Sequence, residues 1–248
     1  MKMQQTYSLY TAEDQQTWQL LFERQILNLQ DKACKEVLEC LEEMKPALHG
    51  DAIPRFEALD QLLLAKTGWS IEVVKGLIPA DEFFELLAQK RFCSSTWLRA
   101  KSQLDYLEEP DMFHDIFGHI PLLMNPKYAD FIQKIGILGV RFGEFPEAVA
   151  MLEKLYWFTI EFGMVREAGK RRIYGAGILS SFLEAKEVMG EGVRIKPFEL
   201  EDVLFRNFRK DELQGLYVEI ASMGHLYGIL TAVEGELMAR FEPVAVSA

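Results

Sequence analysis

The sequence predicts a mostly α-helical protein with small β elements, folded as a single domain. Apolar residues recur at helical spacing over most of the 248 residues, and only short stretches alternate as a strand does. No repeat and no low-complexity linker divides the chain. Hydrophobic residues make up 49% of the sequence, which is typical of a globular protein with a substantial core. We therefore expect one domain over residues 1–248.

The first expected helix begins after Thr11, whose side chain can cap it, and Asp14 lies in its first turn. A second helix is expected over residues 31–48, with Gly50 ending it. The expected elements that follow are a helix from about Pro54 to Gly68, a strand over 69–74, a helix over 81–87, a mixed stretch over 92–98 that suits a short strand, and a helix after Pro110.

The C-terminal half is expected to be largely helical. Prolines stand at positions 126 and 146, where the first turn of a helix accepts them. The expected helices cover residues 126–135, 146–155 with a continuation to 165, 177–189, and 224–241. Residues 199–207 give no clear preference, and residues 213–221 suit either a strand or a helix.

Charge and cysteine content limit the partners and the compartment. The formal net charge is −11 and no basic tract is present, which argues against nucleic acid as a partner. No apolar run approaches the roughly 20 residues that cross a bilayer, and the first residues lack the apolar core of a signal peptide. The three cysteines are few and without paired spacing, so we expect reduced thiols in a cytoplasmic protein.

Two histidines and one glutamate suggest a metal site. His114 and His119 stand five residues apart in an apolar segment, and Glu161 is the only carboxylate in an aromatic run over 156–163. Two imidazoles and a carboxylate form the facial triad of non-haem iron(II) oxygenases. Two alternatives remain open from this pattern: the histidines can be ordinary core or surface residues, and Glu161 can pair with Arg166.

The spacing argues against a zinc protease. The histidines of a His-Glu-x-x-His motif are four residues apart and stand about 40° apart around an α-helix, whereas five residues give about 140°. His119 must therefore lie where the helix ends or distorts, and Gly118 and Pro121 favour such an ending. The general base of the protease motif is also missing, because Asp115 follows the first histidine.

Four segments carry a resemblance to a known family. Residues 106–123 resemble the iron-binding signature of the pterin-dependent aromatic amino acid hydroxylases. Residues 76–84, 156–163 and 174–182 match further segments of that family in the right order. Residues 10–25 are similar to the start of the short bacterial phenylalanine hydroxylases, so the resemblance runs from about residue 8 to about residue 225.

The resemblance implies a fold and a reaction. The fold would be a helical basket around a non-haem iron crevice, built from about residues 76–184. The reaction would be hydroxylation of L-phenylalanine to L-tyrosine with Fe(II), O2 and tetrahydrobiopterin or a related tetrahydropterin, through a ferryl-oxo species. Alternatives are the same chemistry on tyrosine, on tryptophan or at another ring position. A zinc-dependent hydrolase and a non-catalytic helical domain are the competing classes.

The resemblance also implies roles for single residues. His114, His119 and Glu161 would be the iron ligands. Arg99 would receive the carboxylate of the amino acid, because a guanidinium can donate two parallel hydrogen bonds. Trp157 would form the wall for the substrate ring and favours phenylalanine or tyrosine over tryptophan. The remaining substrate-binding candidates are Leu107, Pro110, Ser180 and Ser181.

The resemblance also implies residues that bind the pterin. Phe83 matches the ring that stacks on the pterin, and such a pair contributes roughly 0.5–1.5 kcal/mol beyond burial. The other pterin-binding candidates are Ile78, Ala80, Asp115 and Tyr156.

Glu219 departs from the pattern. An ungapped alignment places it where a side chain of the family helps to set substrate choice, whereas a shift of one residue would place Val218 or Ile220 there. Only about ten residues precede the first expected helix, and the tail after Phe241 is too short for a coiled coil. We therefore expect a monomer without a regulatory domain.

Overall fold

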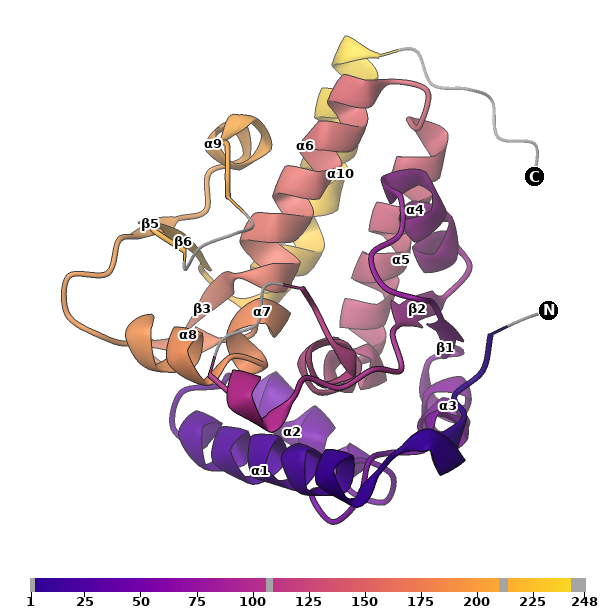
Figure 1. Cartoon of the computed structure of the whole chain (residues 1–248). Coiled ribbons are helices and arrows are strands. Elements are labelled where there is room, and N and C mark those ends of the chain that lie inside the picture. The colour runs from indigo at the N-terminus through magenta and orange to yellow at the C-terminus, as the bar shows by residue number, and fades with distance from the viewer. Residues whose placement is uncertain (1–2, 106–108, 210–213, 242–248) are drawn as a thin grey trace.

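The computed structural model describes residues 3–105, 109–209 and 214–241. Helices form most of it, with both α4 and α10 packed against α5 (Figure 1). The α-helices are α1 Ala12–Leu29, α2 Lys35–Met44, α3 Phe56–Lys66, α4 Ala80–Ala88, α5 Pro126–Arg141, α6 Pro146–Tyr156, α7 Ala176–Leu179, α8 Phe182–Glu187, α9 Leu200–Phe205 and α10 Met223–Arg240. The prediction of a mostly helical protein with small strands is confirmed.

Two small sheets accompany the helices. The strands are β1 Ser70–Val73, β2 Arg91–Ser94, β3 Gly163–Glu167, β4 Lys170–Ile173, β5 Ile195–Pro197 and β6 Tyr217–Ile220. β1 and β2 pair in parallel, and the second sheet has the order β4-β3-β6-β5. Within it, β3 runs antiparallel to β4 and parallel to β6, and β5 runs parallel to β6.

Two wide π-helical segments lie at the centre of the chain. They are η3 His114–His119 and η5 Trp157–Glu161, and both contact α7. The remaining elements are three 3-10 helices, η1 Tyr7–Leu9, η2 Lys101–Gln103 and η4 Pro121–Met124.

Several predicted elements are confirmed, and the capping of α1 is a clear case. The Thr11 hydroxyl accepts a hydrogen bond from the Asp14 N–H at 3.2 Å, and the Asp14 carboxylate accepts one from the Thr11 N–H at 2.7 Å. This reciprocal pair is a capping box, which fixes where a helix starts. The other confirmed elements are α3, β1, α4, α5 and α10.

Other boundaries were predicted wrongly. The helix expected over 31–48 covers only α2, since Pro46 cannot continue it and Cys34 instead donates its N–H to the Ile173 carbonyl at 2.9 Å. The helix expected to reach residue 165 ends in η5 and is followed by β3. The helix expected over 177–189 breaks between α7 and α8.

Two glycines of α5 allow α4 to approach closely. A Cβ on Gly136 would stand 2.3 Å from the Ala88 nitrogen, and one on Gly139 would stand 2.2 Å from the Phe84 ring. These two glycines therefore allow the close packing of α4, which carries the pterin-binding candidates Ala80 and Phe83, on α5.

None of the helices in the described ranges is long and apolar enough to cross a membrane. Cys34, Cys40 and Cys93 are all free thiols, as the cysteine count predicted.

Candidate active site

The π-helical winding of η3 brings His114 and His119 to one side. A π-helix bonds residue i to residue i+5, so residues five apart share a face that they would not share on an α-helix. The sequence expectation of a distorted helix is therefore confirmed. Gly118 lets η3 approach α7, because a Cβ there would stand 2.7 Å from the Ala176 carbonyl oxygen.

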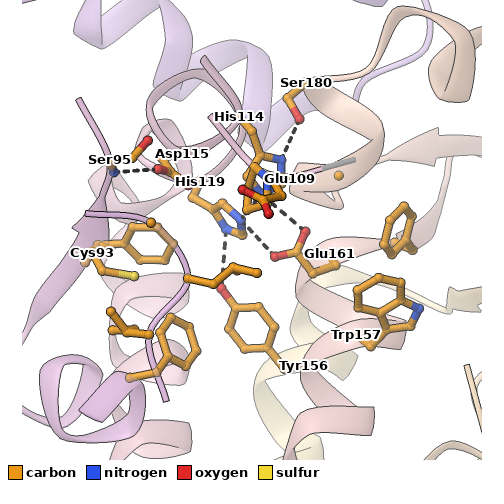
Figure 2. Close-up of a pocket in the computed structure, with 18 of the residues that line it drawn as sticks. Cys93, Ser95, Glu109, His114, Asp115, His119, Tyr156, Trp157, Glu161 and Ser180 are labelled. Carbon is orange, nitrogen blue, oxygen red and sulfur yellow. Dashed lines mark hydrogen bonds and ion pairs between the residues drawn. The ribbon is translucent and has the colours of Figure 1, made fainter. Parts of the chain in front are cut away.

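The three predicted metal ligands meet. The Nε2 atoms of His114 and His119 are 3.1 Å apart, and Glu161 places its carboxylate oxygens 2.9 Å from His119 Nε2 and 3.7 Å from His114 Nε2 (Figure 2). One ligand atom of each residue lies within 4.8 Å of the others. Ligands about 2.1 Å from a metal stand roughly 3.0 Å apart at right angles, so these atoms fit one shared ion.

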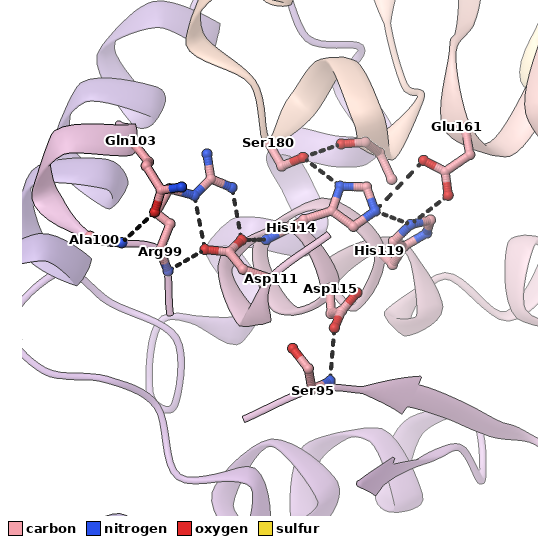
Figure 3. A network of polar contacts seen from close by, with 11 residues as sticks. Ser95, Arg99, Ala100, Gln103, Asp111, His114, Asp115, His119, Glu161 and Ser180 are labelled. Atoms are coloured by element: carbon pink, nitrogen blue, oxygen red, sulfur yellow. Dashed lines mark hydrogen bonds and ion pairs between the residues drawn. The ribbon is translucent and has the colours of Figure 1, made fainter. Parts of the chain in front are cut away.

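Ser180 fixes the tautomer of His114. Its hydroxyl donates to the Ala176 carbonyl at 2.8 Å, so it must accept at its 2.9 Å contact with His114 Nδ1. His114 therefore carries its proton on Nδ1 and presents a lone pair on Nε2 to the metal position (Figure 3). Burial lowers the pKa of His114 to about 4, which keeps this imidazole neutral near pH 7.

The alternative pairing of Glu161 with Arg166 does not occur. The Arg166 guanidinium donates instead to Glu219, with Nε 2.9 Å from Oε2, and Arg171 Nε lies 3.3 Å from Glu219 Oε1. Glu161 points to the two histidines. Its side chain is only 14% exposed, as a metal ligand in a crevice would be.

Arg99 is held by a carboxylate that the sequence reading missed. Asp111 is fully buried and accepts from Arg99 Nε at 2.8 Å and Nη2 at 2.7 Å. The same carboxylate accepts from the backbone N–H of His114 at 3.0 Å, as Figure 3 shows. Arg99 is thus fixed relative to the metal ligands. The signal in the sequence that could have pointed to Asp111 is its position three residues before His114.

A cavity of about 380 Å³ opens onto the three metal ligands. Such a volume suits a small organic molecule. Besides the ligands, the predicted site residues that line it are Ile78, Ala80, Phe83, Arg99, Pro110, Asp115, Tyr156, Trp157, Ser180 and Ser181. Leu107 lies outside the described residues.

Glu219 does not line this cavity. It lies on β6 opposite Met164 of β3, and its carboxylate is occupied by the two arginines of the neighbouring β3 and β4. Glu219 is therefore not placed to contact a substrate ring directly.

The side of the cavity opposite Trp157 is lined by aromatic rings and by the acidic residue Asp115 (Figure 2). Phe83 and Tyr156 meet edge to face with ring centroids 5.2 Å apart. Asp115 accepts from the Ser95 N–H at 2.9 Å, and burial raises the pKa of Asp115 to about 7. Tyr156 places its hydroxyl 3.5 Å from His119 Nδ1.

Several other residues lining the cavity were not predicted from the sequence. Phe92 packs on the His119 ring with centroids 4.7 Å apart, and its place within a short strand was too general a signal. The further missed residues include Cys93, Ser95, Glu184, Phe208 and Gln214. Gln214 comes from the stretch 213–221, which the sequence left open between a strand and a helix.

A family model described as biopterin-dependent aromatic amino acid hydroxylase matches residues 4–242. The chain belongs to this family. Phenylalanine-4-hydroxylase of Chromobacterium violaceum is 44% identical over 219 residues, which cover 88% of this chain and 73% of that relative. The enzyme of the same name from Ralstonia nicotianae is 42% identical over 226 residues, which cover 91% and 71%.

Solved structures of the hydroxylase family agree. Chromobacterium violaceum phenylalanine hydroxylase with bound iron(III) and oxidized cofactor 7,8-dihydrobiopterin superposes with a TM-score of 0.88 at 41% identity, covering 98% of this chain and 88% of that one. The iron- and phenylalanine-bound structure of that enzyme gives a TM-score of 0.87 at 39% identity, with the same coverage. This hydroxylase thus has the fold that the resemblance implied.

Proposed function

We propose that this hydroxylase is a phenylalanine 4-monooxygenase that converts L-phenylalanine to L-tyrosine with O2 and a tetrahydropterin at a mononuclear non-haem Fe(II). The observation that carries the proposal is the meeting of His114, His119 and Glu161 in a cavity with an aromatic wall on each side. Relatives named phenylalanine-4-hydroxylase, at 44% and 42% identity over most of the chain, support the same substrate.

The chain's own donors suit iron(II). Two neutral imidazoles and one carboxylate would hold the ion on one face and leave its other positions directed into the cavity. Bound iron and tetrahydropterin together supply the activation of O2. Ser180 orients His114 through Nδ1 and so keeps its Nε2 lone pair directed at the metal position. Hydrogen bonding to Tyr156 would orient His119 in a similar way.

Substrate positioning falls to Arg99 and Trp157. Asp111 occupies Nε and Nη2 of Arg99, and within the described part of the chain Nη1 makes no hydrogen bond. The two N–H groups of Nη1 are therefore available to the substrate carboxylate. Trp157 lies beyond Glu161 and would pack on the substrate ring, with Pro110, Ser180 and Ser181 completing the pocket (Figure 2).

The pterin would lie against Phe83 on the opposite side of the metal ligands. Phe83 offers a ring face for stacking, and Ile78 and Ala80 line the same part of the cavity. Asp115 and Tyr156 are the polar groups there, and either could bond the pterin directly or through water.

Trp157 leaves less room for the substrate ring than a smaller aromatic residue would, which favours phenylalanine or tyrosine over tryptophan. Apolar pockets discriminate by size only to about 1–3 kcal/mol, so the same chemistry on tyrosine, on tryptophan or at another ring position is the alternative. Any influence of Glu219 on this choice would act indirectly, through β6.

We also propose that residues 1–248 form a single catalytic domain that acts as a monomer in the cytoplasm. The free cysteines are consistent with a reducing compartment. The partners would be small molecules, with neither nucleic acid nor membrane bound, since the net charge is −11.

An aerobic assay with Fe(II), tetrahydrobiopterin and each of phenylalanine, tyrosine and tryptophan tests the proposal. We expect para-tyrosine from phenylalanine, identified by mass and retention time, and dependent on both iron and pterin. Meta-tyrosine, or product from tyrosine or tryptophan alone, would reject the proposed specificity. Turnover of any substrate without pterin or O2 would reject the proposed chemistry.

A further inference from the structure

A buried carboxyl group lies in the cavity wall near Trp157, and the proposed chemistry does not use it. Glu184 on α8 is 4% exposed and lines the cavity. A buried polar group is costly unless its hydrogen bonds are satisfied, so its partners indicate what it does.

Glu184 does not make the local contact that its position offers. Ser181 and Glu184 have the Ser-x-x-Glu spacing of a capping box, in which the glutamate would bond back to the Ser181 N–H. Here the Ser181 hydroxyl accepts from the Glu184 N–H at 3.2 Å, but the Ser181 N–H donates to the Ile178 carbonyl at 3.3 Å. The carboxyl group of Glu184 is turned elsewhere.

The Glu184 carboxyl group points toward Tyr217 of β6 and toward Gln214. Its Oε1 accepts from the Tyr217 hydroxyl at 2.5 Å and from the Gln214 backbone N–H at 3.2 Å. Tyr217 is 2% exposed and pairs with β5 through its backbone. Glu184 therefore ties Gln214 to a buried strand residue.

Gln214 in turn holds Trp157, the proposed wall for the substrate ring. Trp157 donates its indole Nε1–H to Gln214 Oε1 at 3.0 Å, and Phe208 stacks on the indole with centroids 4.4 Å apart and planes inclined by 19°. A hydrogen bond in the plane of the indole and a stacked ring on its face together restrict both torsions of the Trp157 side chain.

We propose that Glu184, Tyr217 and Gln214 form a chain of hydrogen bonds, here called the positioning relay, that sets the orientation of Trp157. The orientation of Trp157 would in turn set the position of the substrate ring. This inference rests on the proposed function, because it assigns Trp157 to the wall of the ring pocket. None of the three residues is assigned to the chemistry itself. They would determine which ring carbon faces the metal position and how firmly the substrate ring is held there.

The relay predicts a defect in accuracy and binding more than in folding. Misplacing a reacting group by about 1 Å can cost on the order of 100-fold in rate. A loosened ring would let pterin be oxidised without hydroxylation and would shift some product to another ring carbon. A purely structural role would lower stability alone.

Tyr217→Phe is the most direct test, because it removes one hydroxyl and leaves the packing. Tyr174→Phe is the matched control, since Tyr174 is also fully buried but its hydroxyl has no partner among the described residues. Glu184→Gln and Gln214→Leu interrupt the relay at its other two members. Each variant is compared with wild type in melting temperature and in phenylalanine affinity, measured by calorimetry on the iron-loaded enzyme without pterin or O2.

We expect Tyr217→Phe to weaken phenylalanine binding by about tenfold, which corresponds to about 1.4 kcal/mol. The ratio of tyrosine formed to pterin oxidised should fall as well. Tyr174→Phe should change neither quantity. Unchanged affinity and coupling in Tyr217→Phe, or equal changes in Tyr174→Phe, would overturn the relay.

A fluorescence measurement separates this inference from the proposed function. The emission of Trp157, taken as the difference between wild type and Trp157→Phe, reports the indole environment without any turnover. Tyr217→Phe should alter that emission, and Tyr174→Phe should not. If wild type fails to hydroxylate phenylalanine, the proposed function is lost. An emission of Trp157 that Tyr217→Phe leaves unchanged would overturn the relay, whether or not phenylalanine is the substrate.

Discussion

Removing the Ser180 hydroxyl should weaken iron binding although Ser180 is not a ligand. The hydroxyl gives its only proton to the Ala176 carbonyl and accepts from His114 Nδ1 at 2.9 Å. In Ser180→Ala, the buried Nδ1–H loses its partner, and nothing then favours the tautomer that leaves Nε2 free. Leaving a buried donor unpaired costs about 1–3 kcal/mol. The loss of a residue that orients a metal ligand typically lowers metal affinity by about 10–100-fold, which agrees with this free-energy cost.

Competition with a chelator measures this affinity directly. We expect the iron Kd of Ser180→Ala to rise about 10–100-fold with the helix content unchanged. Ser181→Ala is the neighbouring control, because that hydroxyl bonds only the backbone N–H of Glu184 at 3.2 Å within the described residues. Equal iron affinity in Ser180→Ala and wild type would refute the tautomer argument.

Three further changes follow from the same geometry. Arg99→Ala should raise the KM for phenylalanine strongly at normal iron content, measured by steady-state kinetics and metal analysis; an unchanged KM would remove Arg99 from the site. Phe83→Ala should weaken tetrahydropterin binding by about 1–3 kcal/mol, measured as the pterin KM, with phenylalanine affinity as the control. Gly139→Ala should destabilise the protein by about 1–3 kcal/mol in urea unfolding, because its Cβ would stand 2.2 Å from the Phe84 ring; equal stability would show that α4 moves freely.

Much of the helical fold follows from local sequence signals. Thr11 and Asp14 cap α1 as their spacing predicts, because a capping box involves only neighbouring residues. The continuation of a helix to residue 165 was wrong for a different reason. β3 is paired on both sides, by β4 and β6, and a buried strand shows the same unbroken apolar run as a buried helix. Sequence period cannot separate the two.

The meeting of the three proposed metal ligands could be expected because they lie within two short motifs. His114 and His119 share one segment, and the π-helical winding that unites them was anticipated only as a distortion. The residues that orient the site were harder to find. Gln214 approaches Trp157 only through tertiary contacts, and Glu184 has a sequence spacing that points to a helix cap and not to a cavity. The ion pairs of Glu219 with Arg166 and Arg171 likewise depend on the pairing of β3, β4 and β6, which its position along the sequence does not show.

The central claim is that His114, His119 and Glu161 hold the iron at which O2 is used to hydroxylate phenylalanine. Turnover under heavy-isotope oxygen gas, with the product tyrosine analysed by mass spectrometry, tests it most directly. We predict one heavy oxygen atom in the new para-hydroxyl group of the wild-type product, and no tyrosine from Glu161→Ala at the same protein concentration. Ordinary oxygen in that hydroxyl group, or full activity of Glu161→Ala, would contradict the account.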